Sequence, residues 1–182
     1  MPNYPVHTIA SAPEGSKSAI EQLKKAFGVL PNLPAVIANS PKLINSLVGL
    51  FGQVHGPGLR EAENQIVLLT DAVTNSSTYA VAFHTALALQ QGISSEEIAA
   101  IRERRLPTDK RFAALSALAK ALIEKHGHLS KQELNSFMAA GFTKEQVLEV
   151  IAIVAASTIT NYAGTIANPT LEDPFSQYAW RG

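Results

Sequence analysis

The sequence predicts an all-α protein with a single domain. Apolar residues recur at helical spacing along most of its 182 residues, and no stretch shows the alternation that a strand requires. Capping patterns, glycines and prolines separate these stretches, and no linker divides the chain. We therefore expect an N-terminal arm over residues 1–12, a helical domain over residues 13–167 and an aromatic C-terminal tail over residues 168–182.

The first half of the chain contains four predicted helices. They cover residues 19–27, 42–54, 59–73 and 74–91. The proline-rich segment 30–34 is expected to be a rigid connector. Ser40 is the predicted N-cap of the second helix, because it precedes a proline suited to the first helical position. The predicted buried face of that helix consists of Leu43, Leu47, Leu50 and Phe51.

The second half is punctuated by capping boxes, in which a Ser or Thr precedes a Glu or Gln by three residues. Ser94, Ser130 and Thr143 begin such boxes. We expect the helix after Ser94 to run through residue 104, the helix after Ser130 to run to residue 140, and the helix after Thr143 to cover 144 to about 167. A further amphipathic helix covers 109–125. The last helix is apolar nearly all round between 147 and 159, so we expect a neighbouring subunit to complete its burial. The tail is expected to pack onto a surface of its own chain or of a partner.

The composition excludes several classes of function. Charged residues make up 16% of the chain, against roughly 25% in soluble proteins, which favours a homo-oligomer that covers part of its surface. The formal net charge is zero, and no basic block suggests a nucleic-acid or membrane partner. The longest nearly apolar run, 150–156, is short of the ~20 residues of a membrane span. The N-terminus lacks a signal peptide, so a cytoplasmic protein is expected.

The segment 75–92 is the most informative part of the sequence. A polar start leads into an Ala-rich helix that carries His84 and stops at Gly92. This arrangement resembles the active-site helix of the AhpD-like alkylhydroperoxidase and carboxymuconolactone decarboxylase superfamily. The similarity runs from about Leu59 to Ala167 and includes the segments 92–98 and 141–150 in the family's order. The resemblance implies an all-helical AhpD-like bundle that assembles as a trimer or hexamer, with active sites near subunit contacts.

The resemblance also assigns roles to positions, and most of the functional groups are missing. The family's histidine falls on His84, whereas its two cysteines fall on Ser77 and Ala80. The glutamate of the peroxidase proton relay corresponds to Gln65. The decarboxylase branch uses a carboxylate four residues before the histidine, which is again Ala80. The chemistry of both branches is therefore absent from this helix.

Thiol peroxidation needs an ionised thiol and a second thiol that closes a disulfide. The chain has no cysteine, so this chemistry is excluded. Ser77 and His84 are seven residues apart, or about 10 Å along a helix. A nucleophile and its base must approach to roughly 3 Å, so a direct Ser77–His84 pair is not expected.

We predict a small-molecule pocket around His84. His84 and Gln65 are the candidate catalytic residues, with His84 as a neutral base or hydrogen-bonding group that Gln65 orients. Ser77, Tyr79 and Ala80 are the candidate substrate-binding residues, and the small Ala80 leaves space for a ligand. The alternatives are that His84 is a satisfied buried histidine and that Tyr79 only packs. No cofactor or metal is predicted, since His126 and His128 fit a helix end better than a metal site.

Three readings of the function remain open at this stage. The first is a family protein that binds a small organic molecule, with possible proton transfer at an organic acid or lactone. The second is a non-enzymatic oligomeric scaffold or binding protein. The third is a cysteine-substituted variant of an alkylhydroperoxidase. The sequence alone leaves open whether the protein is an enzyme.

Overall fold

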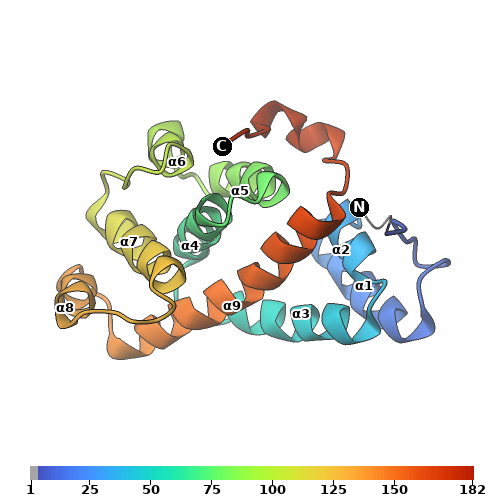
Figure 1. Ribbon diagram of the computed structural model, residues 1–182, viewed down its shortest axis with the longest axis horizontal. Helices are drawn as coiled ribbons and strands as arrows, with labels where there is room; N and C mark the ends of the chain where they lie inside the picture. Colours follow the sequence, from blue (N-terminus) through green and yellow to red (C-terminus); the bar gives the residue numbers. More distant parts are fainter. Residues whose placement is uncertain (1–3) are drawn as a thin grey trace.

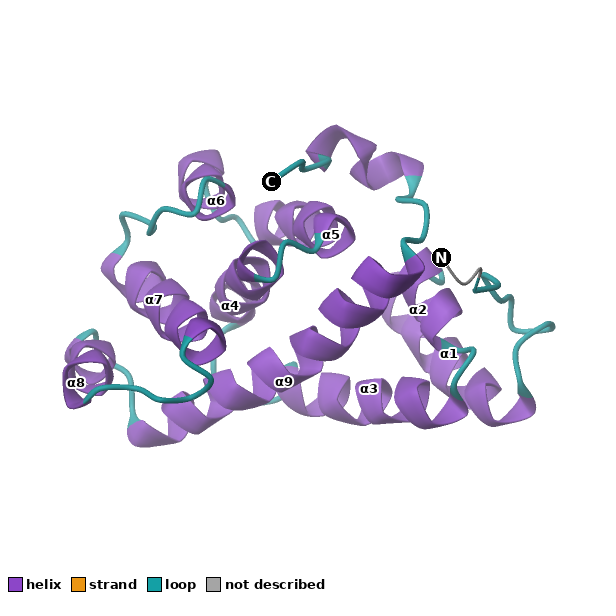
Figure 2. Ribbon diagram, viewed as in Figure 1, coloured by secondary structure: helices purple, strands orange, loops and turns teal. Residues whose placement is uncertain are grey.

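The computed structural model describes residues 4–182, which form helices and loops without any strand (Figures 1 and 2). Residues 1–3 of the predicted arm lie outside the described residues. The elements are α1 (Glu14–Phe27), α2 (Asn32–Ile37), α3 (Pro41–Val54), α4 (Glu61–Thr74), α5 (Thr78–Gln90), α6 (Ser95–Arg102), α7 (Lys110–Glu124), α8 (Lys131–Ala139), α9 (Lys144–Ala167) and the 3-10 helix η1 (Asp173–Tyr178). The predicted all-α, single-domain fold is confirmed.

Local signals set most helix boundaries. The side chains of Ser40, Ser94, Ser130 and Thr143 each accept a hydrogen bond from a backbone N–H in the first turn of the following helix. These bonds satisfy donors that would otherwise have no partner at a helix start. The capping patterns in the sequence therefore predict where these four helices begin.

Two predictions about the N-terminal part are wrong. Segment 30–34 is not only a connector, because α2 begins at Asn32 and contains Pro34 in its first turn. Proline is tolerated there since a first-turn N–H has no helical acceptor. In α3, Leu43 is 36% exposed, whereas Ile44 is fully buried. The buried face is shifted by one residue because α3 packs against α1 and α9.

Helix α9 is the central element of the fold. It crosses the molecule in Figure 1 and contacts α2, α3, α4, α5 and α7. By length and composition alone, α9 is long and apolar enough to cross a membrane. The sequence predicted no such helix, because only the short apolar run 150–156 was considered. Helix α9 packs against five helices, and 33% of its most apolar 18-residue window is buried.

Two hydrophobic clusters flank α9. The larger one is built from α4 to α9 and includes Ile66, Leu69 and Leu115. The smaller one is built from the N-terminal arm and α1 to α3, and the ring of Tyr79 on α5 completes it. The two clusters belong to one fold because the neighbouring residues Tyr79 and Ala80 on α5 contribute to the smaller and the larger cluster, respectively.

The C-terminal tail packs on its own chain. Helix η1 contacts α5, and the ring of Phe175 lies 5.1 Å from that of Phe83 in an edge-on arrangement. The indole Nε1 of Trp180 donates a hydrogen bond of 3.0 Å to the backbone oxygen of Arg102. Within the described residues, this aromatic segment therefore covers α5 and the end of α6.

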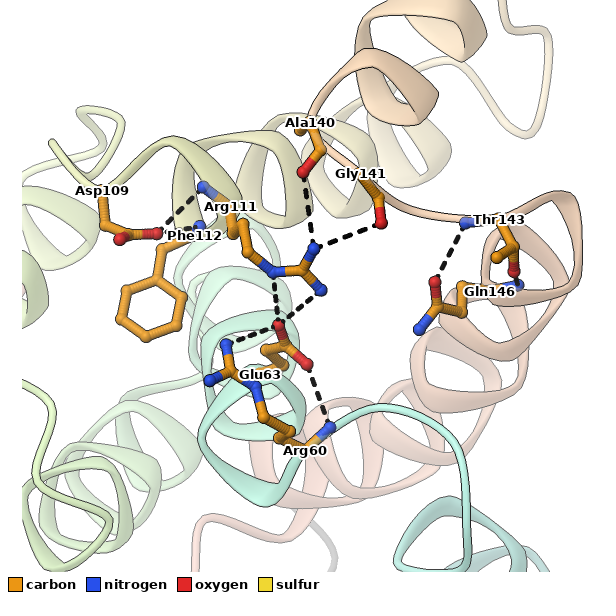
Figure 3. Close-up of polar contacts among 9 residues, drawn as sticks. All are labelled: Arg60, Glu63, Asp109, Arg111, Phe112, Ala140, Gly141, Thr143 and Gln146. Atoms are coloured by element: carbon orange, nitrogen blue, oxygen red, sulfur yellow. Dashed lines mark hydrogen bonds and ion pairs between the residues drawn. The ribbon is translucent and has the colours of Figure 1, made fainter.

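An ion-pair network around the buried Glu63 fixes the start of α4 (Figure 3). The carboxylate of Glu63 accepts hydrogen bonds from the guanidinium groups of Arg60 and Arg111 and from the backbone N–H of Arg60. Arg111 in turn donates to the backbone oxygens of Ala140 and Gly141. The network therefore ties α4, α7 and the α8–α9 turn together.

Candidate functional site

A cavity of about 80 Å³ lies between the two hydrophobic clusters. Its walls come from α1, α2, α3, α4, α5 and α9 and from the loops beside them. The lining residues are Leu23, Phe27, Pro31, Leu33, Pro34, Leu47, Phe51, Val54, His55, Leu68, Tyr79, Ala80, Phe83, His84, Ala156, Ser157 and Thr160. Most of these side chains are apolar or aromatic, and a few polar groups converge among them, as in many small-molecule sites.

His84 lies on α5 with its ring in the cavity wall. Its Nδ1 is 3.0 Å from the side-chain oxygen of Gln65 on α4. The amide nitrogen of Gln65 donates a 2.7 Å hydrogen bond to the carboxylate of Glu61, so its oxygen must be the atom that faces the histidine. That oxygen can only accept a hydrogen bond, and the proton of neutral His84 is therefore on Nδ1. Nε2 is left as a free acceptor.

The hydrogen bonds continue beyond Gln65 to a second histidine. The other carboxylate oxygen of Glu61 lies 2.8 Å from Nδ1 of His55, in the loop after α3. It also accepts a 3.3 Å hydrogen bond from the side-chain amide of Asn64. The ring of His55 lines the same cavity as His84. Two cavity histidines are thus linked through one amide and one carboxylate.

The surroundings lower the pKa of both His84 and Glu61, which favours a neutral His84 and a charged Glu61 near pH 7. Burial, with a smaller contribution from the nearby His55, lowers the pKa of His84 to about 4, although Glu61 opposes the shift. His84 is therefore a neutral base near pH 7. Burial alone would raise the pKa of the Glu61 carboxyl, but hydrogen bonds from His55 and Gln65 outweigh this effect and hold it below its usual range.

Tyr79 and Ala80 both line the cavity. Tyr79 belongs to the smaller hydrophobic cluster and Ala80 to the larger one. The hydroxyl of Tyr79 donates to the carboxylate of Glu172 at 2.8 Å and accepts from the backbone N–H of Leu33. Burial, followed by the negative charge of Glu172, raises the pKa of Tyr79, which therefore stays a neutral phenol. Its hydroxyl is used within the fold, and its ring is the part available to a ligand.

Ser77 is placed differently from the other predicted site residues. It is the N-cap residue of α5, and its side chain makes no cap hydrogen bond. Its hydroxyl is buried without a partner in the described part of the chain, and Ser77 is not part of the cavity lining. Helix α5 begins after Ser77, yet no hydrogen bond joins it to His84. The structure thus brings together His84, Gln65, Tyr79 and Ala80, but not Ser77.

Two polar residues of the site were missed by sequence reasoning. In the sequence, His55 precedes a Gly-Pro-Gly turn, and Glu61 is one of two glutamates within the four residues before Gln65. Glu61 is four residues before Gln65, and that spacing places both on one helix face, so it could have indicated the contact. No sequence signal connects His55 to His84, since their link depends on how α3, α4 and α5 pack. Within residues 4–182, no three His, Asp or Glu side chains are arranged to hold a metal ion.

Comparison with known proteins gives a fold and a family match to part of the chain. Residues 41–122 match the carboxymuconolactone decarboxylase family. An uncharacterised peroxidase-related protein with an AhpD core from Ralstonia eutropha JMP134 superposes with a TM-score of 0.82, at 18% identity over 95% of this chain and 93% of that chain. An uncharacterised peroxidase-related protein from Silicibacter sp. TM1040 has a TM-score of 0.79 at 14% identity, over 97% and 94% of the two chains.

The debrominase Bmp8, as a C82A variant in complex with 2,3,4-tribromopyrrole, has a TM-score of 0.80 at 16% identity, over 98% of this chain and 96% of that chain. A search of curated proteins found no match. At these identities the structural likeness establishes the fold, and the family match covers α3 to most of α7. Together they show that the chain has the AhpD-like fold, that residues 41–122 are similar to the carboxymuconolactone decarboxylase family, and that the Cys-x-x-Cys pair is absent.

Proposed function

We propose that the protein binds a small organic molecule in the cavity beside His84, with Nε2 of His84 as hydrogen-bond acceptor or general base. One observation carries the proposal. Gln65 accepts from Nδ1 of His84 while its own amide donates to Glu61, which leaves Nε2 unprotonated on a ring that lines the aromatic cavity. A neutral imidazole in such a place can accept a proton from a weakly acidic ligand. The chemistry is not thiol-dependent, since the chain has no cysteine.

The size and composition of the cavity favour a small, largely apolar ligand. Phe27, Phe51 and Phe83 contribute aromatic rings, with Phe27 5.5 Å from each of the other two. Debrominase Bmp8, which shares the fold, is known in complex with 2,3,4-tribromopyrrole. A flat ring with a weakly acidic N–H, O–H or C–H would fit this combination of walls and acceptor.

Replacing His84 with leucine tests the role of the histidine. We expect binding of 2,3,4-tribromopyrrole, measured by calorimetry, to weaken at least tenfold in His84→Leu because the only free acceptor at this position is lost. The exposed His128 provides the matched control, and His128→Leu should bind as the wild type does. Equal affinity in all three proteins, or a His84→Leu protein that mainly loses stability, would make His84 a structural residue.

A non-catalytic binding protein is the second candidate. It is favoured by the replacement of three functional positions of the family, which here are Ser77, Ala80 and Gln65. The third reading, a cysteine-substituted peroxidase variant, is decided by the natural gene: cysteine codons at positions 77 and 80 would establish it.

We also propose that the protein is a soluble, cytoplasmic homo-oligomer and that the outer face of α9 contacts a second copy. Leu148 is 67% exposed, and Ile151, Tyr162 and Ile166 are also exposed on this helix. Successive members of this set are three, eleven and four residues apart, which places them on one face of the helix. No charged residue occurs in α9 after Glu149, so this face is apolar over most of its length. An apolar face of this kind is typical of an interface between identical subunits.

Light scattering after gel filtration tests the oligomer. We expect the wild type to be larger than a monomer. The double variant Leu148→Glu/Tyr162→Glu should be a monomer that retains its helical content, because two negative charges on each copy would repel those on the other. The control changes Leu106, which is exposed away from α9, to glutamate and should not alter the mass. A monomeric wild type would refute the interface and the inference drawn from the low charge content.

A further inference from the structure

The second cavity histidine, His55, has a defined orientation. Its Nδ1 donates to Glu61, so only Nε2 remains for a ligand. The ring of Phe51 packs against it with centroids 4.3 Å apart and restricts its rotation. Both His55 and Phe51 line the cavity. His55 is therefore oriented by a hydrogen bond and by ring packing, although it comes from a loop.

Glu61 contacts His55 directly and His84 only through Gln65. It is one residue away from His84, because the Gln65 amide stands between them. It contacts His55 directly, at 2.8 Å, and a positive charge on His55 would be balanced by this carboxylate. An amide does not exchange protons as a carboxylate does, so Gln65 prevents proton transfer between the histidines while it contacts both Glu61 and His84. A base and a hydrogen-bond donor that line the same cavity are suited to acid–base work.

We propose that His55 is the acid partner of His84 and that Glu61 is its positioning residue, so that the cavity acts on a small enolisable carbonyl compound. The inference rests on the proposed function, because it assigns a substrate class and a second group to the same cavity. Tyr79 is not the acid, since its hydroxyl is already donated to Glu172. The remaining polar lining groups, Ser157 and Thr160, are ordinary hydroxyls that do not ionise near pH 7.

The step is a proton transfer in which atoms and charge balance. Nε2 of His84 takes a proton from the carbon next to the carbonyl, and the electron pair of that C–H bond forms the carbon–carbon double bond of the enol. The carbonyl π electrons move to oxygen, which takes a proton from Nε2 of His55. Positive charge thus passes from His55 to His84. Reversal returns both histidines to their starting states and exchanges the carbon-bound hydrogen.

Deuterium incorporation into cyclohexanone in heavy water tests the pair. Mass spectrometry should show exchange by the wild type above the buffer rate. Calorimetry with cyclohexanone measures binding separately. We expect His84→Gln to reduce exchange by at least a hundredfold and His55→Gln by at least tenfold, with the dissociation constant changed less than threefold in His55→Gln. Glu61→Gln should resemble His55→Gln, because the positioning carboxylate is lost.

Nitrogen NMR of the histidine rings gives a readout that does not depend on activity. The wild type should show His84 with its proton on Nδ1, and Gln65→Leu should remove that preference. Glu61→Gln should shift the His55 ring signals while leaving His84 as the Nδ1–H form.

The outcomes separate this inference from the proposed function. Cyclohexanone that binds but does not exchange above the buffer rate overturns the acid–base pair and leaves the binding function intact. Unchanged exchange in His55→Gln assigns the reaction to His84 alone and also overturns the inference. Absence of binding by both cyclohexanone and 2,3,4-tribromopyrrole overturns the proposed function itself. Recovery of exchange in His55→Lys, which restores a cationic donor, would support the acid role.

Discussion

Replacing Asp71 with asparagine should stabilise the protein at pH 8 by on the order of 4 kcal/mol and should have little effect near pH 4. Asp71 is 0% exposed in the interface of α4 and α9. Burial raises its pKa from 3.8 to about 7, and hydrogen bonds from Ser157 and Asn75 offset only part of that shift. No charged side chain among the described residues contributes to the shift. The carboxylate form is therefore costly inside the fold.

The direction of the pH dependence follows from this raised pKa. Between about pH 4 and pH 7 the folded state holds a proton on Asp71 that the unfolded state has lost, so the stability contribution falls as pH rises. Each pKa unit corresponds to about 1.4 kcal/mol, which over roughly three units gives the expected difference. For a chain of this size the gain at pH 8 corresponds to roughly 10 °C in melting temperature.

His84 acts in the opposite direction over part of the same range. Its pKa is lowered from 6.5 to about 4, so its contribution to stability rises with pH between these values. The wild-type profile alone is therefore flatter than either group would make it. The difference between Asp71→Asn and wild type cancels the His84 contribution and isolates Asp71.

The geometry allows asparagine at position 71. The side-chain oxygen of Asn161 has no hydrogen-bond partner, while its amide nitrogen lies 3.3 Å from Asp71. Turning the Asn161 amide would let that oxygen accept from an asparagine at 71. Chemical unfolding at pH 4, 6 and 8 measures the difference. A stability difference that is equal at all three pH values would show that Asp71 is not a protonated buried acid.

Replacing Glu63 with glutamine should destabilise the protein by about 2–3 kcal/mol at pH 7. The Glu63 side chain is 2% exposed and is bonded by two arginines as well as by the N-terminal backbone of α4 (Figure 3). Hydrogen bonds to a charged group each contribute about 1.5–3 kcal/mol. Arg60 and Arg111 keep access to water, so losing their partner costs less than the 3–5 kcal/mol typical of breaking a fully buried pair.

Glu133 provides a matched control for Glu63. It occupies the same capping-box position in α8 and pairs with Lys125, but both side chains lie at the surface. Glu133→Gln should therefore change the unfolding midpoint in urea much less than Glu63→Gln. The arginine hydrogen bonds outweigh burial and lower the pKa of Glu63, so the Glu63→Gln penalty should shrink as pH falls below about 4.5. Equal effects of the two substitutions would contradict the role assigned to Glu63.

Most of the helices could be predicted because their signals are local. Ser40, Ser94, Ser130 and Thr143 cap their own helices, and each bond spans three residues of one segment. Helix α2 escaped prediction because Pro34 discourages helix in general but is harmless in a first turn. The exposure of Leu43 was not predicted, because the apolar residues of α3 are spaced so that either of two faces could be buried. Packing against α1 and α9 determines which face it is.

The sequence by itself determined the all-α class, the family resemblance and the absence of thiol chemistry, and it indicated His84 and Gln65 as candidate site residues. Each of these depends on residue identity or on spacing within one helix. Only the tertiary structure decided which groups form the site. It excluded Ser77 from the cavity lining, added Glu61, and placed His55 beside the same cavity as His84. These contacts join different elements, and their geometry follows from how the two hydrophobic clusters pack around α9.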